Sequence, residues 1–209
     1  MKTAVFGATG LTGARVVALA LDEGHDVVAL TRDASRFPLV HERLTVVEGD
    51  AASPADVRKA LQGVDAVVHC LGIGGKGNGQ PTSVVSDSVK VVLDEMEPAS
   101  VSRIVCMSNV GAGESGSWLY RRAILPLFLR WLRPIIADKN VMEAALRNSA
   151  AEWVAVRIPN IVEGPWKPVR SSETGQGIGI SITASSVARF LLEQTTSSHW
   201  LRKAPSISN

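Results

Sequence analysis

The chain has 209 residues, of which 45% are hydrophobic, a size that suits one α/β domain with a sizeable core and leaves little room for a second folding unit. Its 22 basic and 20 acidic residues nearly cancel to a net charge of +2, which argues against nucleic acid as a partner and favours a small molecule. Cys70 and Cys106 fall in predicted buried strands and lack the spacing of a zinc or redox motif, so we expect reduced thiols. We find neither a signal-peptide pattern nor an apolar run of membrane-spanning length, and we therefore expect a cytoplasmic protein.

Strand and helix patterns alternate along the chain, which is typical of a mostly parallel sheet. Strands are expected at 2–6, 26–30, 43–48, 65–70, 103–107 and 153–158, with helices at 11–21, 53–62, 83–96 and 135–148. Residues 160–177 are rich in Pro, Gly and Ser and should form a long loop, followed by a strand near 178–182, a helix at 184–193 and a last strand near 200–207. We therefore predict an α/β fold of the doubly wound Rossmann type in a single domain, residues 1–209, with a small C-terminal substrate region.

A glycine-rich turn, GATGLTG at 7–13, lies where the first strand gives way to the first helix. Gly7, Gly10 and Gly13 are spaced GxxGxxG rather than GxGxxG, so the position of the turn in a βαβ unit strengthens the assignment. Glycine permits positive φ and close approach of backbone N–H groups to an anion, and the helix directs its positive dipole end to the same place. The turn is therefore predicted to bind a pyrophosphate.

The end of the second strand reads Leu30-Thr31-Arg32-Asp33, where an NAD enzyme usually carries an acidic residue for the ribose 2′-hydroxyl. A guanidinium at Arg32 matches a phosphate, and Arg36 adds a second cation, so we predict NADP, with NADPH as the reduced form. The alternative is that Arg32 is solvated and Asp33 faces the ribose, which would select NAD. After the third strand, Asp50 and the backbone of Ala51 are expected at the adenine, although Gly-Asp is also a common turn.

Taken together, these motifs resemble an atypical short-chain dehydrogenase/reductase, in the NAD(P)H-binding group that contains the flavin and biliverdin reductases. The resemblance rests on GATGLTG at 7–13, ALTRD at 29–33, VEGD at 47–50, DAVVHCLG at 65–72, CMSNV at 106–110 and LRNSAAEWVAVRIPNI at 146–161. It implies that Thr9, Leu11, Thr12, Arg32 and Arg36 line the phosphates, Leu71 and Gly72 the ribose, and Ser108, Pro159 and Ile161 the nicotinamide. Asn160 stands where the biliverdin-reductase-like pattern would have a histidine, which leaves the substrate open.

The Tyr-x-x-x-Lys pair common in the larger family is absent, because the only tyrosine, Tyr120, is followed four residues later by Ile124. Lys139 is the better lysine candidate, since similar proteins place a lysine on this helix near the nicotinamide ribose; an ordinary surface lysine is the alternative. Ser108 is expected to orient the carboxamide or relay a proton, or else to cap the loop after the fifth strand. The four histidines form neither a triad nor a metal spacing, so we predict no metal site.

The substrate side is expected to comprise residues 109–134 and 159–182, with Asn109, Trp118, Tyr120 and Trp166 facing the substrate. Segment 118–134 is dense in large apolar residues and arginines, and we interpret it as a helical flap broken near Pro126, a dimer surface or a membrane-surface helix. The protein is expected to be a monomer or homodimer.

Without a strong protein acid, the favoured acceptors of hydride are planar ones such as a flavin, a quinone or a biliverdin-like tetrapyrrole, for which the protein mainly positions two flat rings. We therefore predict an NADPH-dependent reductase. The alternative is a nonenzymatic NADP(H)-binding redox sensor. A nucleotide-sugar epimerase or dehydratase is disfavoured by the missing tyrosine and the small C-terminal region.

Overall fold

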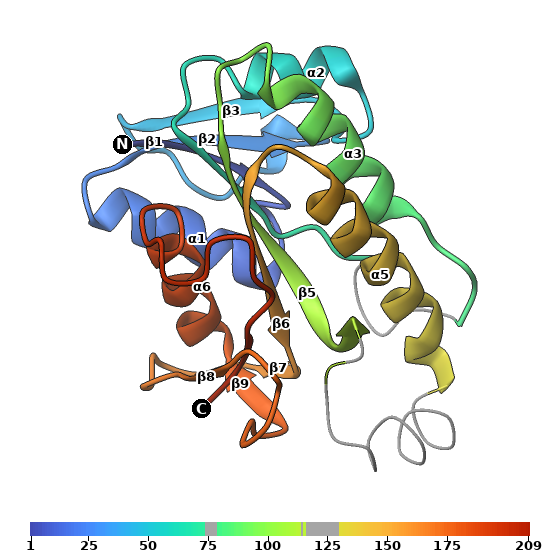
Figure 1. Cartoon of the computed structure of the whole chain (residues 1–209). Coiled ribbons are helices and arrows are strands. Elements are labelled where there is room, and N and C mark those ends of the chain that lie inside the picture. Colours follow the sequence, from blue (N-terminus) through green and yellow to red (C-terminus); the bar gives the residue numbers. More distant parts are fainter. Residues whose placement is uncertain (74–78, 114, 116–129) are drawn as a thin grey trace.

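A mostly parallel, eight-stranded sheet forms the middle layer of the protein (Figure 1). The computed structural model describes residues 1–73, 79–113, 115 and 130–209. The strands follow the order β3-β2-β1-β4-β5-β6-β10-β8, and only β8 runs antiparallel to its neighbour. Their bounds are β1 Lys2–Phe6, β2 Asp26–Thr31, β3 Leu44–Glu48, β4 Ala66–His69, β5 Arg103–Gly113, β6 Glu152–Ile158, β8 Arg170–Ser172 and β10 Ser206–Ser208. The predicted doubly wound Rossmann-type fold is confirmed.

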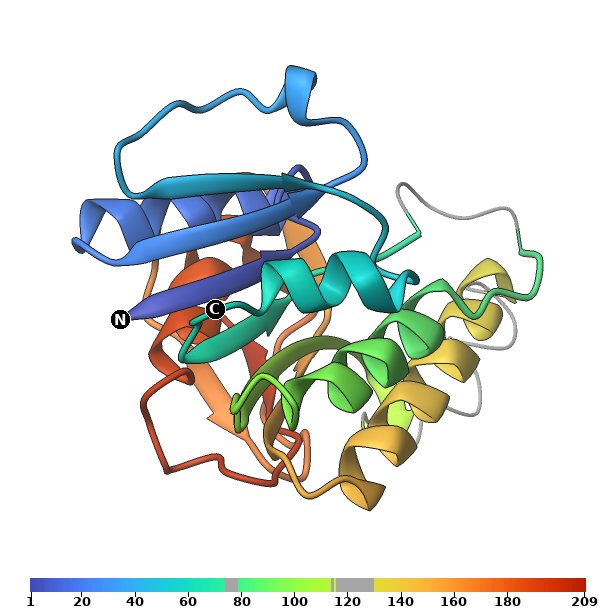
Figure 2. The same cartoon turned by 90° about the horizontal axis from the view of Figure 1, so that it is seen from above.

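Helices cover both faces of this sheet (Figures 1 and 2). Helices α1 Leu11–Asp22 and α6 Ala184–Glu193 lie on one face, and α2 Pro54–Ala60, α3 Val84–Met96 and α5 Arg133–Asn148 lie on the other. The central strands are therefore apolar on both sides, as in β4, where all four residues are buried. Along β1, Ala4 and Phe6 join the core under α2, α3 and α5, whereas Val5 joins the core under α1 and α6.

The sheet reverses its winding direction between β1 and β4. Chain order runs outward from β1 to β2 and β3 on one side, and from β4 to β5 and β6 on the other. The carboxyl ends of β1 and β4 meet where Phe6 pairs with His69. In doubly wound sheets, ligands bind in the crevice beyond the strand ends at such a switch point. The glycine turn that follows Phe6 lies at this place.

Three predicted strand boundaries were wrong. Strand β5 continues to Gly113 instead of ending at Met107, because β6 keeps pairing with it as far as Asn109 opposite Ile158. The predicted strand near 178–182 is reduced to β9 Ser181–Thr183. The last strand was expected at 200–207 but covers Ser206–Ser208, since Arg202 adopts φ +55° in a turn in which Lys203 N–H bonds the Trp200 carbonyl.

The segment predicted as one long loop, residues 160–177, contains two short strands. Strand β7 Asn160–Val162 pairs with β9, and β8 pairs with β10.

Cys70 also differs from expectation, because it lies half-buried one residue beyond the end of β4, whereas Cys106 is buried inside β5 as predicted. Both cysteines are free thiols.

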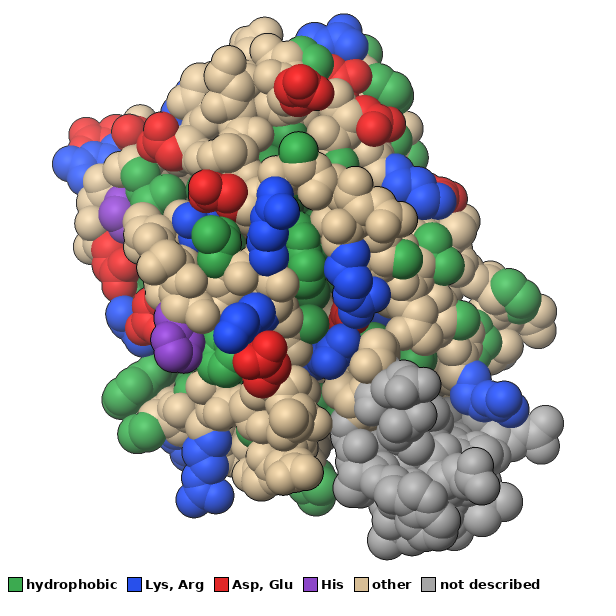
Figure 3. All heavy atoms as spheres, viewed as in Figure 1, with side chains coloured by type: hydrophobic (Ala, Val, Ile, Leu, Met, Phe, Trp, Pro, Cys, Tyr) green, Lys and Arg blue, Asp and Glu red, His purple; other side chains and the backbone are tan. Residues whose placement is uncertain are grey.

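Most of the predicted flap at 118–134 lies outside the described residues, and so do Trp118, Tyr120 and the break at Pro126. At its described end, residues 130–132 form a 3-10 turn, and Arg133 and Pro134 begin α5. Within the described helices, none has both the length and the apolar character needed to cross a membrane. Acidic and basic side chains are interspersed over the described part of the face in Figure 3, in keeping with the net charge of +2.

Candidate functional site

The turn between β1 and α1 presents an open helix N-terminus. Gly7 adopts φ +79°, and its carbonyl accepts a hydrogen bond of 3.0 Å from the N–H of Gly10, the N-cap residue of α1. In the described structure no side chain caps this helix, and Thr9, Gly10 and Leu11 are exposed. The N–H groups of the first turn are thus available to an anion. Thr12 is buried, so we expect it to meet a phosphate through its backbone N–H.

The outer two glycines of the turn are required by close backbone approach. A Cβ on Gly7 would lie 2.9 Å from the backbone of both Cys70 and Leu71, where the chain leaves β4. A Cβ on Gly13 would overlap the carbonyl oxygen of Gly7 and lie 2.8 Å from its carbonyl carbon. Gly13 therefore allows α1 to pack directly on the turn, and the resulting cradle fits the pyrophosphate of a dinucleotide.

Gly13→Ala is expected to lower the free energy of unfolding by about 1–3 kcal/mol, because the overlap is with backbone that cannot rotate away. The better helix propensity of alanine, about 1 kcal/mol, works against this loss but does not cancel it. Urea denaturation measures the change. Gly179→Ala is the control, since its Cβ would find ordinary contacts, the nearest at 3.4 Å. Equal stability of Gly13→Ala and wild type would contradict the close approach.

The carboxyl end of β2 favours Arg32 over Asp33 as the residue facing the cofactor. Asp33 is the N-cap of the 3-10 turn η1 Ala34–Arg36, and its Oδ1 accepts from the backbone N–H of Ser35 at 3.1 Å and from the Ser35 hydroxyl at 2.6 Å. Arg32 is exposed beside it. The side chain of Arg36 lies outside the described residues, although its backbone ends η1.

Asp50 stands in a turn after β3. Its Oδ1 accepts from the N–H of Ala52 at 2.9 Å, and its own N–H donates to Asp56 Oδ2 at 3.1 Å. That backbone hydrogen bond is the largest cause of the lowered pKa of Asp56. Ala51 is half-buried against the core. The structure thus supports the turn interpretation of Asp50, and its exposed carboxylate keeps an oxygen for the predicted adenine contact.

Lys139 links the segment after β4 to the middle of β5. It lies on α5, is only 4% exposed, and donates from Nζ to the carbonyls of Met107 at 2.7 Å and Leu71 at 3.3 Å. Burial lowers its pKa to about 8. An ammonium has three N–H groups, so these two contacts leave one for a ligand beside Leu71 and the exposed Gly72. Lys139 is therefore not an ordinary surface lysine.

Asp138, next to Lys139 on α5, and His69, at the end of β4, both have hydrogen-bond partners within the fold. Asp138 accepts from the N–H groups of Val85 and Ser86 at 3.0 and 2.9 Å, which ties the start of α3 to α5. His69 ends β4, is buried, and makes a 2.7 Å contact from Nε2 to the Ser88 hydroxyl. Burial lowers the pKa of His69 to about 3, so this histidine is neutral and a poor general acid. Across the described residues, no three His, Cys, Asp or Glu side chains come close enough to hold a metal.

Ser108 lies inside β5, two residues beyond the last pair of β4 and β5, His69 and Cys106. It is 2% exposed and donates to Glu143 Oε1 at 2.8 Å. The interpretation as a cap of the loop after the strand is therefore wrong. From the sequence we did not identify Glu143 as a site residue, nor its ion-pair partner Arg157 in β6. A signal existed, because an arginine within the apolar run 153–158 requires a buried acidic partner.

The other predicted site residues in the described part of the chain lie within β5 or after β6. Asn109 is half-buried in β5, Pro159 and Ile161 are half-buried, and Asn160 is exposed at the start of β7. Trp166 is 52% exposed, as expected for a residue available to a ligand. An ion pair between Arg15 of α1 and Glu163 connects the first helix to the segment after β7.

Comparison with known proteins assigns the chain to a family. Residues 7–198 match a family model described as NAD(P)H-binding. The chain belongs to this NAD(P)H-binding family. It is 27% identical over 206 residues to the UPF0659 protein YMR090W of Saccharomyces cerevisiae, a match that covers 92% of this chain and 86% of the yeast protein. It is 36% identical over 175 residues to the photosystem II assembly factor Ycf39 of Synechocystis, a match that covers 78% of this chain but 46% of Ycf39, about half its length.

A solved structure extends the likeness to the fold. ChuY, an anaerobillin reductase from Escherichia coli O157:H7, has a TM-score of 0.81 and 22% identity, covering all of this chain and 97% of ChuY. The match to the NAD(P)H-binding family begins at Gly7, the first residue of the cradle. The family match agrees with the predicted resemblance to an NAD(P)H-binding group, and the likeness to ChuY agrees with the predicted Rossmann-type fold.

Proposed function

We propose that this protein is an NADPH-dependent reductase that passes a hydride to a planar acceptor such as a flavin, a quinone or a biliverdin-like tetrapyrrole. The observation that carries the proposal is Lys139, whose buried ammonium joins Leu71, two residues beyond the end of β4, to Met107 within β5, where the nicotinamide ribose of a dinucleotide would lie. Membership of the NAD(P)H-binding family and likeness to a reductase fold support it.

The cofactor would be held at four places: the pyrophosphate, the adenine end, the nicotinamide ribose and the nicotinamide. The Gly7 to Gly13 cradle and the start of α1 bind the pyrophosphate, with Thr9, Gly10, Leu11 and Thr12 as its lining. Asp50 and Ala51 face the adenine end after β3. Lys139, Leu71 and Gly72 meet the nicotinamide ribose, and Ser108, Pro159, Asn160 and Ile161 surround the nicotinamide. NADPH supplies the hydride when bound, while these residues orient it and exclude water.

Arg32 is proposed to select NADPH by pairing with the 2′-phosphate. Arg32→Ala should therefore weaken NADPH binding about 10- to 100-fold, the value of a charge-assisted hydrogen bond, and leave NADH binding within about twofold. Fluorescence titration with both cofactors measures this. The control is Lys90→Ala, which removes the same charge from an exposed pair on α3. Equal losses for NADPH and NADH would rule out the assignment.

The acceptor is proposed to be one that needs no strong protein acid. The residue four positions before Lys139, where a Tyr-x-x-x-Lys pair would place tyrosine, is the half-buried Ile135. Flavin N5 and comparable conjugated atoms accept hydride directly. Exposed apolar side chains suited to a flat ring follow β6, namely Val162, Trp166 and Ile180. Residues 109–134 and 159–182 would thus form the substrate side, with Asn109 and Trp166 among the described contacts.

The test is the loss of reduced-nicotinamide absorbance when purified protein is mixed with NADPH or NADH and with FMN, FAD, riboflavin, a quinone series or biliverdin. Turnover of at least one planar acceptor, faster with NADPH, is the expected result. Binding of NADPH without turnover of any acceptor would favour the second candidate, a nonenzymatic NADP(H)-binding protein. The similarity to the assembly factor Ycf39 is the observation that favours this second candidate.

A further inference from the structure

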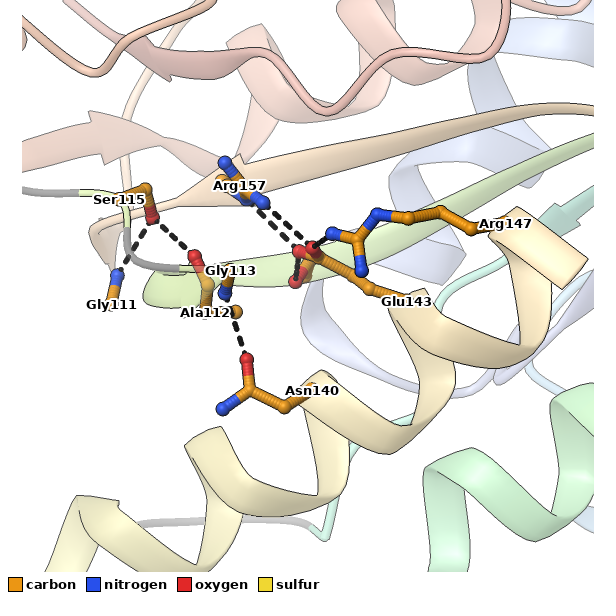
Figure 4. A network of polar contacts seen from close by, with 9 residues as sticks. Gly111, Ala112, Gly113, Ser115, Asn140, Glu143, Arg147 and Arg157 are labelled. Atoms are coloured by element: carbon orange, nitrogen blue, oxygen red, sulfur yellow. Dashed lines mark hydrogen bonds and ion pairs between the residues drawn. The ribbon is translucent and has the colours of Figure 1, made fainter.

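A buried carboxylate stands directly behind Ser108. Glu143 of α5 is 1% exposed, and three charged or polar side chains donate to it (Figure 4). Arg157 Nε lies 3.0 Å from Oε1 and Arg157 Nη2 2.7 Å from Oε2, Arg147 Nη2 lies 2.6 Å from Oε2, and Ser108 Oγ lies 2.8 Å from Oε1. With two guanidinium groups on it, Glu143 acts as a hydrogen-bond acceptor.

This arrangement fixes the direction of the Ser108 hydrogen bond. A hydroxyl has one hydrogen, which Ser108 gives to Glu143, so only its oxygen lone pairs remain for another partner. Ser108 can then accept from an N–H group but cannot donate. The carboxamide of a nicotinamide bound beside Ser108 would offer such an N–H. A proton relay through Ser108 would require Glu143 to return a proton, and an ion-paired carboxylate has none to give.

The Glu143 carboxylate also lies beside Gly113, the last residue of β5. A Cβ on Gly113 would overlap Arg157 Nη2 and lie 2.8 Å from Glu143 Oε2, so only glycine allows this approach. The N–H of Gly113 donates to Asn140 Oδ1 at 2.8 Å, one turn before Glu143 on α5. Ser115 closes the turn by accepting from the N–H of Gly111 at 3.0 Å. Glu143 therefore bonds Ser108 and also lies beside Gly113 at the end of β5, as Figure 4 shows for Gly113.

We propose that Glu143 is a positioning residue that holds Ser108 as a hydrogen-bond acceptor for the nicotinamide carboxamide, with Arg157 fixing the carboxylate. This rests on the proposed function, since it assigns a role within the same cofactor site. The competing explanation is an ion pair that serves folding alone. The two differ in what happens when the carboxylate becomes an amide of the same shape.

Glu143→Gln is expected to reverse the hydrogen bond. The position of Oε2 receives hydrogen bonds from two guanidinium groups, Arg157 Nη2 and Arg147 Nη2, whereas that of Oε1 receives one, from Arg157 Nε. The amide oxygen therefore takes the position of Oε2, and the NH₂ group takes that of Oε1 beside Ser108. Ser108 then accepts from Gln and directs its own hydrogen at the carboxamide N–H. We expect kcat to fall about 10- to 100-fold, as for a small misplacement of the reacting ring, with KM for NADPH within about twofold. Glu152→Gln is the control, because it removes the charge from another Arg-paired glutamate of this sheet, at the start of β6. Its kcat should match wild type.

The second arm is Ser108→Ala, which leaves the ion pairs intact. We expect it to lower kcat by a similar factor, and the double variant with Glu143→Gln to be no slower than Ser108→Ala alone, because both act through one contact. Losses that multiply in the double variant, or a kcat of Glu143→Gln equal to wild type, would overturn the proposal.

Bound-cofactor fluorescence tests the proposal without any acceptor. Both variants should change the emission of bound NADPH while binding 2′,5′-ADP, which lacks the nicotinamide, within about twofold of wild type. Emission equal to wild type in Ser108→Ala would overturn the proposal even if Glu143→Gln does not fold. If wild type binds NADPH but turns over no acceptor, the reductase function fails while this emission test still decides the role of Glu143.

Discussion

Replacing Lys139 with methionine is expected to lower kcat/KM for NADPH oxidation by about 100-fold or more. The variant loses the ammonium that we propose holds the nicotinamide ribose, and electrostatic and positioning groups at reaction sites contribute about this much. Methionine fills similar space, so the fold should persist. Steady-state kinetics with the best acceptor measures the loss, and Lys90→Met, an exposed lysine on α3, is the control. Activity within about threefold of wild type would remove Lys139 from the site.

The same variant changes how stability depends on pH. The pKa of Lys139 is lowered from 10.5 to about 8 by burial, so between those values the unfolded chain binds a proton that the folded chain does not. The free energy of unfolding of wild type should therefore rise across this window, by at most about 3 kcal/mol relative to Lys139→Met. Below pH 8 both states carry the charge and the difference between the two proteins stays constant. Urea denaturation at neutral pH and near pH 10 measures the rise.

Elements with strong local signals were predictable from the sequence. Helix α6 was expected at 184–193 and forms there, and the Thr183 side chain caps it by accepting from the N–H of Ser186. The glycine turn was also predictable from the spacing of its glycines. Gly7 is needed for its positive φ, and Gly13 is needed because a side chain there would overlap the Gly7 carbonyl. In each case the residues that decide the structure are neighbours in the chain.

What the sequence did not reveal depends on contacts between distant segments. Strands β7 and β8 are three residues each, too short for an alternation pattern, and form because partner strands lie beside them. Glu143 looked like one more charge on an amphipathic helix. Its importance follows from the pairing of β5 with β6, which brings Ser108 opposite Arg157. Lys139 was a candidate from family resemblance, but its burial needed the fold.

Arg157→Met is expected to lower the free energy of unfolding by about 3–5 kcal/mol, the usual cost of leaving one member of a buried ion pair without its partner. Glu143 would lose two charge-assisted hydrogen bonds and keep Ser108 and Arg147, and Arg147 is 46% exposed and better solvated than Arg157. Urea denaturation measures the change. The loss should shrink in the double variant Arg157→Met with Glu143→Met, because the uncompensated buried charge is then absent.

An exposed ion pair is the control for Arg157→Met. Lys203 and Glu173 form an ion pair of 3.1 Å with both side chains about half exposed, so Lys203→Met should cost at most about 1 kcal/mol. If Arg157→Met costs no more than that, water reaches Glu143 and its carboxylate is not held in one orientation. If the double variant is as unstable as the single one, the loss comes from packing of the Arg157 side chain, whose guanidinium group lies beside Gly113, rather than from the charge. Either outcome would show that the stability of this region does not depend on the carboxylate that orients Ser108. A large loss for Arg157→Met with partial recovery in the double variant would show that one carboxylate, Glu143, determines both.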